Sequence, residues 1–257
     1  IRDKIKSPEN LRDNSILLNS LEKKITLFHA KICSQIIEEC RLDVDIIGFH
    51  GQTIFHSADK KISRQLGDGN LLSNLLRKKV IYNFRKNDII NGGEGAPLAP
   101  IFHHLLVKQN AIKLPVCILN IGGIANITIV STEDPNDLKS YDIGPGNCLL
   151  DEWVRKHSKE RFDKNGTLAK SGKTNKIILN QAIDNFDNIK KINNLSFDVK
   201  DVDLNFVRGL SLEDGLSTLI EFTASIIHDS IIKENFFIKD KNLNILICGG
   251  GRKNLSL

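Results

Sequence analysis

Three short apolar runs that each end at a glycine-containing turn constrain most strongly what this chain can fold into. They are residues 44–49, 116–121 and 244–248. Runs of this length and composition are typical of strands buried in a sheet, and a glycine at the end of a strand lets backbone amides approach a ligand. Segments with helical periodicity lie between the runs. Strands that alternate with helices predict an α/β protein.

Two long segments have the apolar spacing of amphipathic helices. In residues 14–42 the apolar positions are Leu17, Leu21, Ile25, Phe28, Ile32 and Ile36, and in residues 211–234 they are Leu212, Leu216, Leu219, Phe222 and Ile226. We also expect a short helix at 71–76, a strand at 80–84 and a loop at 141–147. The helix after this loop has Leu149, Leu150 and Trp153 on one face. Residues 160–209 show no regular pattern, and we assign no element to them.

A glycine- and proline-rich segment, NGGEGAPLAP at residues 91–100, is the candidate domain boundary. A chain of 257 residues is long enough for two domains. We therefore predict one domain at residues 1–90 and a second at residues 91–257. Within the second, the runs at 116–121 and 124–130 are joined by Gly122 and Gly123, which predicts a β-hairpin.

The composition argues against several classes of protein. The net charge of +5 comes from 36 Lys and Arg against 31 Asp and Glu, scattered without interleaved aromatic residues, which is typical of a solvated surface and not of a nucleic-acid groove. No apolar run reaches the ~20 residues that span a bilayer, and the N-terminal sequence IRDKIKSPEN has no signal-peptide core, so we expect a cytosolic protein without membrane contact. Five cysteines without CxxC spacing predict neither a disulfide framework nor a zinc site.

Four histidines, His50, His56, His103 and His104, raise the question of a metal site. No HExxH pattern or pair of histidines with a carboxylate accompanies them. His103 and His104 are neighbours on an expected helix and so face different ways. We reject the metal hypothesis for these residues.

The sharpest local motif is residues 120–126, NIGGIAN, where two glycines lie between two predicted strands. Exposed amides at such a hairpin tip can hold phosphate oxygens. A plain type I′ turn without a ligand explains Gly122 and Gly123 equally well.

A second motif, residues 141–147 (YDIGPGN), sets Asp142 in an expected turn stiffened by proline and opened by two glycines. A carboxylate held in this way can bind magnesium or act as a general base. The alternative is an Asp that accepts backbone N–H bonds in a turn. Asn147 or a neighbour is the expected cap of the following helix.

A third motif runs from the predicted strand through Gly249, Gly250 and Gly251. A turn without side chains lets an adenine or a phosphate lie against the backbone. The motif lacks the GxGxxG spacing of a dinucleotide fold. Cys248, which precedes the glycines, is interpreted as a small core residue rather than a ligand contact.

Polar groups upstream suit a polyhydroxylated, anionic substrate. They lie in three short segments, 50–53 (HGQT), 65–68 (QLGD) and 84–88 (FRKND). Arg85 is the natural partner for a carboxylate, because its planar guanidinium can donate two parallel hydrogen bonds. Lys86 and Asn87 are expected to be surface residues.

Seven segments, taken in order, resemble the anhydro-N-acetylmuramic acid kinase family. They are GFHGQTIFH (48–56), QLGDGN (65–70), NFRKNDIINGGEGAPLAPIFHHLL (83–106), LNIGGIANITIV (119–130), YDIGPGNCLLDEW (141–153), GLSLEDGLSTLIEFTA (209–224) and ICGGGRKN (247–254). The resemblance covers nearly the whole chain. Seven segments in the family's order are much harder to match by chance than any single glycine turn.

The resemblance implies a two-lobed, actin-like ATPase fold of the ribonuclease H-like type, with nucleotide bound between the lobes. Residues 1–90 would form part of an incomplete first lobe on the sugar side, and residues 91–257 the second, nucleotide-binding lobe. It also implies an enzyme that uses ATP, Mg²⁺ and water to convert 1,6-anhydro-N-acetylmuramic acid into N-acetylmuramic acid 6-phosphate during peptidoglycan recycling in the cytoplasm. The family further suggests a homodimer, and its metal ligands cannot be identified in this chain.

Residue roles follow from the same resemblance. Asp142 would be the base that activates water. The nucleotide would be bound by Gly122, Gly123, Asn126, Gly249, Gly250 and Gly251, and the sugar by Thr53, Asp68, Arg85 and Gly144. Arg85 would hold the lactyl carboxylate of the sugar.

The chain departs from the family pattern at three places. A Gly-Thr-Ser-x-Asp-Gly-type phosphate loop would precede Ile1, a further sugar-binding stretch would follow Leu257, and the usual Lys-Ser with a nearby Arg is replaced by the segment from Leu195 to Val199. We therefore expect residues 1–257 to be a fragment that does not turn over ATP by itself. Two alternatives stay open: a degenerate, non-catalytic relic that binds nucleotide or sugar, and a kinase for a different sugar, which an Arg85 facing away from the substrate would favour.

Overall fold

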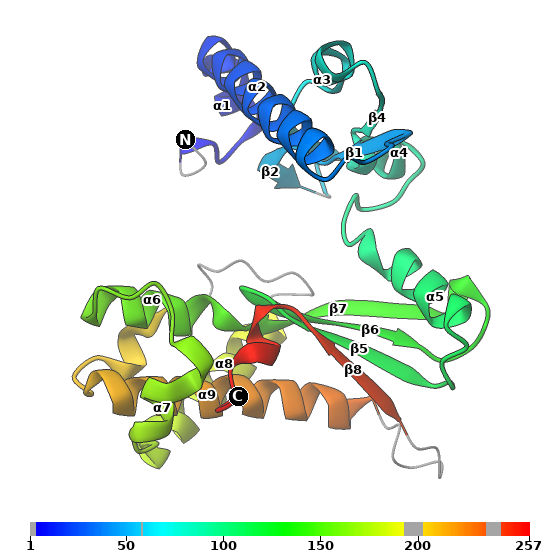
Figure 1. Ribbon diagram of the computed structural model, residues 1–257. Helices are drawn as coiled ribbons and strands as arrows, with labels where there is room; N and C mark the ends of the chain where they lie inside the picture. Colours follow the sequence, from blue (N-terminus) through cyan, green and yellow to red (C-terminus); the bar gives the residue numbers. More distant parts are fainter. Residues whose placement is uncertain (1–3, 58, 193–202, 235–242) are drawn as a thin grey trace. The chain divides into compact units, whose positions relative to one another are not determined.

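A computed structural model describes residues 4–57, 59–192, 203–234 and 243–257 (Figure 1). The chain divides into two compact units, Ile1–Leu98 and Ala99–Leu257. The division falls inside the glycine- and proline-rich segment 91–100, after Leu98 rather than after Ile90. The segment from Leu195 to Val199, where the chain departs from the family pattern, lies outside the described residues.

The first unit contains two small sheets and four helices among its described residues. Its helices are α1 (Pro8–Asp13), α2 (Ser15–Glu39), α3 (Gly69–Leu76) and α4 (Phe84–Ile90), and its strands are β1 (Ile46–Phe49), β2 (Gln52–Ser57), β3 (Ile62–Leu66) and β4 (Lys79–Tyr82). β1 pairs parallel with β4, and β2 pairs antiparallel with β3. The expected long helix, short helix and two strands are confirmed, whereas β2 and β3 were not predicted.

The predicted apolar face of α2 was partly right, because Leu21 and Ile25 pack against the core cluster of Leu18, but other predicted positions face solvent. Leu18, Thr26 and Ala30 are the buried positions, whereas Phe28 is 63% exposed and Ile36 is 48% exposed. Leu18 packs in a cluster with strand residues of the β2–β3 pair, and Ala30 packs in a second cluster against the β1 side. The packed face thus also includes Thr26 and Ala30, which are not large apolar residues, so hydropathy spacing alone does not reveal it.

The second unit is built on a four-stranded mixed sheet. Its strands are β5 (Val116–Ile121), β6 (Ile124–Val130), β7 (Leu138–Pro145) and β8 (Asn244–Cys248), in the order β7-β6-β5-β8. β5, β6 and β7 are antiparallel neighbours, and β8 pairs parallel with β5. The predicted hairpin and the predicted strand at 244–248 are confirmed. The predicted loop at 141–147 was wrong, because most of it belongs to β7.

The glycine and proline in β7 explain this error. Gly144 has φ +152°, a conformation that favours glycine, and Pro145 ends the strand. Both residues normally indicate a turn. β7 lies at the edge of the sheet, where a proline without an N–H group is tolerated.

Helices cover both faces of this sheet. They are α5 (Ala99–Gln109), α6 (Asn147–His157), α7 (Thr167–Ser171), α8 (Lys176–Ile192) and α9 (Leu212–Lys233). The main core joins one face of the sheet to α6, α8 and α9, and Phe222 is completely buried in it. On the other face, Val107 of α5 packs against Val116, Ile118 and Val130. In Figure 1, α9 runs along the face of the sheet that carries the main core, and α5 lies near the end of the sheet where β5 begins.

The helix at residues 212–233 was predicted, with Leu216, Leu219, Phe222 and Ile226 buried as expected. Helix α8 was missed, although Leu179, Ala182 and Phe186 are buried at helical spacing. Asn, Asp and Lys between these positions hid the pattern. Within the described parts of the chain, no helix has the length and apolar character that crossing a bilayer requires.

Candidate functional site

The glycine hairpin and the start of α6 meet at the carboxyl end of β5. The amide of Asn147 donates to the carbonyl of Gly122 at 2.8 Å, and the amides of Gly146 and Cys148 donate to the carbonyl of Gly123 at 2.9 and 3.1 Å. Neither hairpin glycine has a positive φ. A type I′ turn requires positive φ at both central residues, so that interpretation is wrong. The hairpin tip is shaped by its bonds to α6 instead.

The expected cap of α6 was Asn147 or a neighbour, and the neighbour Gly146 is the N-cap residue, with no side-chain hydrogen bond to the helix start. The side-chain amide of Asn147 instead donates to the carbonyl of Ile121 at 3.0 Å, which ties α6 to the end of β5. The first amides of α6 are bonded to the hairpin carbonyls, so the helix start can favour an anion only through its dipole.

The third glycine motif comes to the same place. Gly249 follows β8 with φ +84°, and a Cβ on it would lie 2.5 Å from the carbonyl oxygen of Ile121. A Cβ on Gly251 would overlap the side chain of Ile121. A Cβ on Gly250 would meet only the Asn147 side chain, at 3.7 Å. Two of the three glycines are therefore required by packing, and Gly250 has room for a larger residue.

A row of polar residues crosses the sheet next to these turns. Asn120 is paired with Asn126, Asn126 with Asp142, and Asn120 also with Cys248. Directly paired residues place their side chains on the same face of a sheet. The row lies on the same face of the sheet as α5, which covers the opposite end of that face. Cys248 packs partly against the apolar cluster under α5, and its Sγ lies 3.8 Å from Oδ1 of Asn120.

A β-bulge places Asp142 in this row. Ile124 pairs with Pro145 and Ala125 with Gly144, and the register then shifts before Asn126. Without the shift, Ile143 would lie opposite Asn126 and Asp142 would face the buried core. The bulge instead buries Ile143 completely and sets the Asp142 carboxylate on the open, polar face. Bulges of this kind commonly re-aim a side chain beside an active site.

His103 extends the polar face and was considered from the sequence only as a metal ligand. Its Nδ1 lies 2.9 Å from Oγ1 of Thr128, one pair along the sheet from Asn126. Burial lowers the pKa of His103. A neutral imidazole therefore lines the face that carries Asp142.

The family match covers almost all of the chain: the family model described as anhydro-N-acetylmuramic acid kinase matches residues 2–257. The chain belongs to the anhydro-N-acetylmuramic acid kinase family. It is 64% identical over 257 residues to a protein named anhydro-N-acetylmuramic acid kinase from Pelagibacter ubique (strain HTCC1062), covering 100% of this chain and 68% of that protein.

Two further relatives carry the same name. The protein from Rhodospirillum rubrum (strain ATCC 11170) is 35% identical over 234 residues, which cover 91% of this chain and 60% of the relative. The protein from Gluconobacter oxydans (strain 621H) is 37% identical over 243 residues, which cover 91% and 64%. The chain thus spans about two thirds of the length of the curated relatives it matches.

Three of the four predicted sugar-binding residues, Thr53, Asp68 and Arg85, lie in the first unit, and Gly144 lies in β7 of the second. Arg85 is in α4, where its Nε donates to Nε2 of His50 at 3.2 Å and its Nη1 donates to the carbonyl of Gly95 at 3.0 Å. Thr53 is in β2, and its Oγ1 accepts from Nε2 of Gln65 at 3.4 Å. Among the residues that the structure describes, no hydrogen bond joins Thr53 to Arg85.

Two of the predicted sugar ligands have a structural explanation. Oδ1 of Asp68 accepts from the amide of Leu71 at 2.9 Å and caps α3. Gly144 is buried, and a Cβ on it would lie 2.6 Å from Cζ of Phe186, so packing alone requires glycine there. A sugar contact by either residue stays a prediction. Lys86 and Asn87 are exposed, as expected.

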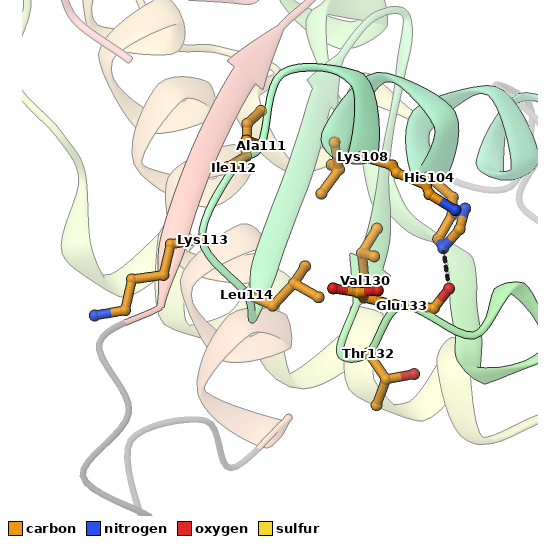
Figure 2. Close-up of a pocket in the computed structure, with 10 residues that line it drawn as sticks. His104, Lys108, Ala111, Ile112, Lys113, Leu114, Val130, Thr132 and Glu133 are labelled. Atoms are coloured by element: carbon orange, nitrogen blue, oxygen red, sulfur yellow. Dashed lines mark hydrogen bonds between the residues drawn. The ribbon is translucent and has the colours of Figure 1, made fainter.

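A cavity in the second unit lies away from the glycine turns. It has a volume of about 430 Å³ and is lined by His104, Val107, Lys108, Ala111, Ile112, Lys113, Leu114, Val130, Thr132 and Glu133. Figure 2 shows Nε2 of His104 hydrogen-bonded to the Glu133 carbonyl, at 3.0 Å, beside this cavity. Leu114 precedes β5 and Val130 ends β6, so the cavity is at the opposite end of the sheet from Gly122 and Gly123.

Proposed function

We propose that the complete gene product transfers the γ-phosphoryl group of ATP to 1,6-anhydro-N-acetylmuramic acid, with addition of water, to give N-acetylmuramic acid 6-phosphate. The observation that carries this proposal is the meeting of both glycine motifs and the Asp142 row at the carboxyl end of β5, in a chain of this kinase family. The relatives' name supports the substrate. We place the reaction in peptidoglycan recycling in the cytoplasm, where ATP is supplied.

The second unit has the features needed to hold a nucleotide. The amides of Gly122 and Gly123 are at a tight hairpin tip, and the start of α6 lies beside them with its first amides bonded to the hairpin carbonyls. The hairpin amides and the dipole of the helix N-terminus favour phosphate oxygens. The Gly249–Gly251 turn can accept the adenosine because its surface carries no side chains, and Asn126 can donate its amide to a phosphate. We propose that this unit is the nucleotide-binding lobe of an actin-like ATPase fold.

Mg²⁺ fits this site through the nucleotide. Among the described residues, no group of three His, Cys, Asp or Glu side chains could hold a metal ion by itself. Mg²⁺ is commonly held by substrate phosphates with one or two carboxylates, and Asp142 is the carboxylate in the polar row. When bound, the ion would neutralise charge on the phosphates.

Asp142 is proposed as the general base. It takes a proton from a water molecule, whose oxygen bonds to the anomeric carbon while the bond between that carbon and O6 breaks. The released O6 takes the γ-phosphoryl group, and ADP leaves with the electron pair of the broken phosphoanhydride bond. Asn126 is the direct neighbour of Asp142 in the polar row, with Asn120 one strand further on, and its side-chain amide can orient the water. Thr53, Asp68, Arg85 and Gly144 are proposed to contact the sugar, and a second copy of the chain is proposed as a partner in a homodimer.

Asp142→Asn tests this proposal. The change keeps the side-chain shape and removes its basicity, so turnover should fall by the ~10² to 10⁴ that a positioned base contributes, with ATP affinity nearly unchanged. Asp229→Asn, an exposed carboxylate of α9, is the matched control and should keep full activity. Activity of Asp142→Asn within a factor of a few of the parent would refute the assignment. Nucleotide binding without any transfer by the parent would favour the non-catalytic relic.

A further inference from the structure

The guanidinium group of Arg85 is held from two sides by neutral acceptors. Nε donates to the ring of His50, which follows β1, and Nη1 donates to the carbonyl of Gly95, in the loop after α4. Within the described parts of the chain, no carboxylate oxygen forms an ion pair with Arg85. The side chain is half-buried, and this burial lowers the pKa of Arg85. A partly desolvated cation with neutral partners favours an anionic ligand.

The hydrogen bonds of His50 determine its tautomer. Nδ1 lies 3.0 Å from the carbonyl oxygen of Gly51, which can only accept, so Nδ1 carries the proton. Nε2 then has a lone pair, and it accepts from Arg85. Both contacts require a neutral imidazole, because a protonated ring would present an N–H group to the guanidinium.

Gly95 fixes the second contact. Its amide donates to Oδ2 of Asp88 at 2.7 Å, and its φ is +74°. A Cβ on Gly95 would lie 2.7 Å from Cδ1 of Ile89, so a larger residue does not fit. The Gly95 carbonyl is thus set against Nη1 of Arg85. Nη2 has no hydrogen-bond partner among the described residues and stays available.

We propose that His50 is a positioning residue that orients Arg85 toward the carboxylate of the substrate. The inference rests on the proposed function, which supplies a sugar with a lactyl carboxylate. A neutral histidine suits this task better than Asp or Glu, because it fixes the direction of the guanidinium without neutralising its charge. The full charge and the Nη2 donors then remain for the ligand carboxylate.

Calorimetric binding to the complete gene product tests this role without depending on turnover. The ligands are 1,6-anhydro-N-acetylmuramic acid and an analogue that lacks the lactyl group. His50→Leu removes the acceptor and should weaken binding of the carboxylate sugar by about tenfold, the scale of one hydrogen bond to a charged group, and leave the analogue unchanged. His50→Gln retains an acceptor at similar reach and should restore most of the affinity.

His228→Leu, at an exposed histidine of α9, is the control and should bind like the parent. His50 is exposed, so thermal unfolding of both His50 variants should match the parent. An equal loss for both ligands, or a His50→Leu variant that keeps the parent's preference for the carboxylate, would overturn the inference while the proposed function stands. The expected binding pattern in a protein that transfers no phosphate would support the inference and sink the proposed function.

Discussion

Replacing Gly249 with alanine would add a methyl group where β8 turns against the end of β5. Gly249 has φ +84° and ψ 175°, a region of the backbone map that only glycine occupies readily. Its Cβ would lie 2.5 Å from the carbonyl oxygen of Ile121 and 2.6 Å from Oδ1 of Asn120. The carbonyl belongs to the backbone of a central strand and cannot move away without shifting the sheet.

The cost follows from these two effects. An L-residue in this conformation costs about 1–3 kcal/mol, and overpacking costs about 1–3 kcal/mol. A combined loss of about 3 kcal/mol would lower the melting temperature of a unit of this size by roughly 6–12 °C, since each kcal/mol shifts it by about 2–4 °C. Gly250→Ala is the matched control, because its Cβ has only the Asn147 side chain nearby, at 3.7 Å, and its φ is not positive. Its effect should stay within about 0.5 kcal/mol.

Tryptophan fluorescence during heating gives the required readout. Trp153 is the single tryptophan of the sequence, is 3% exposed, and donates from Nε1 to the carbonyl of Leu212 in the second unit. Gly249→Ala should melt early, and Gly250→Ala should melt with the parent but bind ATP more weakly, because its methyl group occupies the proposed adenosine surface. Equal melting temperatures for the two variants would refute the close packing of Gly249 on β5.

Two other changes test separate parts of the account. Arg85→Lys should raise KM for the anhydro sugar with little change in kcat, since lysine lacks the planar guanidinium. Removing the lactyl group from the sugar should cost the parent more affinity than it costs the variant. Equal losses of affinity would disprove the contact. Burial lowers the pKa of His103, so below its ordinary value of about 6.5 the unfolded chain binds more protons and the second unit loses stability as the pH falls. His103→Gln should reduce this loss of unfolding free energy between about pH 7 and 5, measured by urea titration at each pH. An unchanged dependence of the unfolding free energy on pH would contradict the lowered pKa of His103.

Local patterns in the sequence were sufficient for much of the fold. The apolar runs at 116–121 and 244–248 become β5 and β8 because their burial and their glycine turns act over a few residues. Helix α9 follows from five apolar positions at helical spacing and its Ser211 cap, whose Oγ accepts from the amide of Asp214. The motif YDIGPGN is sufficient to identify Asp142 as a candidate base.

The geometry of the site depends on contacts that a local pattern does not contain. The bulge between Ala125 and Asn126 decides which face Asp142 occupies, and no residue type in YDIGPGN marks that shift. Arg85 meets His50 because β1 pairs parallel with β4, which brings together segments far apart in the chain. Register and strand pairing are set by the whole sheet, so they became visible only in the structure.

Isotope tracing of the product tests the central claim most directly. The complete gene product is incubated briefly with ATP, Mg²⁺ and 1,6-anhydro-N-acetylmuramic acid in ¹⁸O-labelled water, and the sugar phosphate is analysed by mass spectrometry beside an enzyme-free sample that corrects for spontaneous exchange. If Asp142 activates water at the anomeric carbon, N-acetylmuramic acid 6-phosphate should form with one ¹⁸O at that carbon and none in its phosphate. Label appearing only in free inorganic phosphate, with no sugar phosphate formed, would mean that the protein merely hydrolyses ATP and would contradict the account.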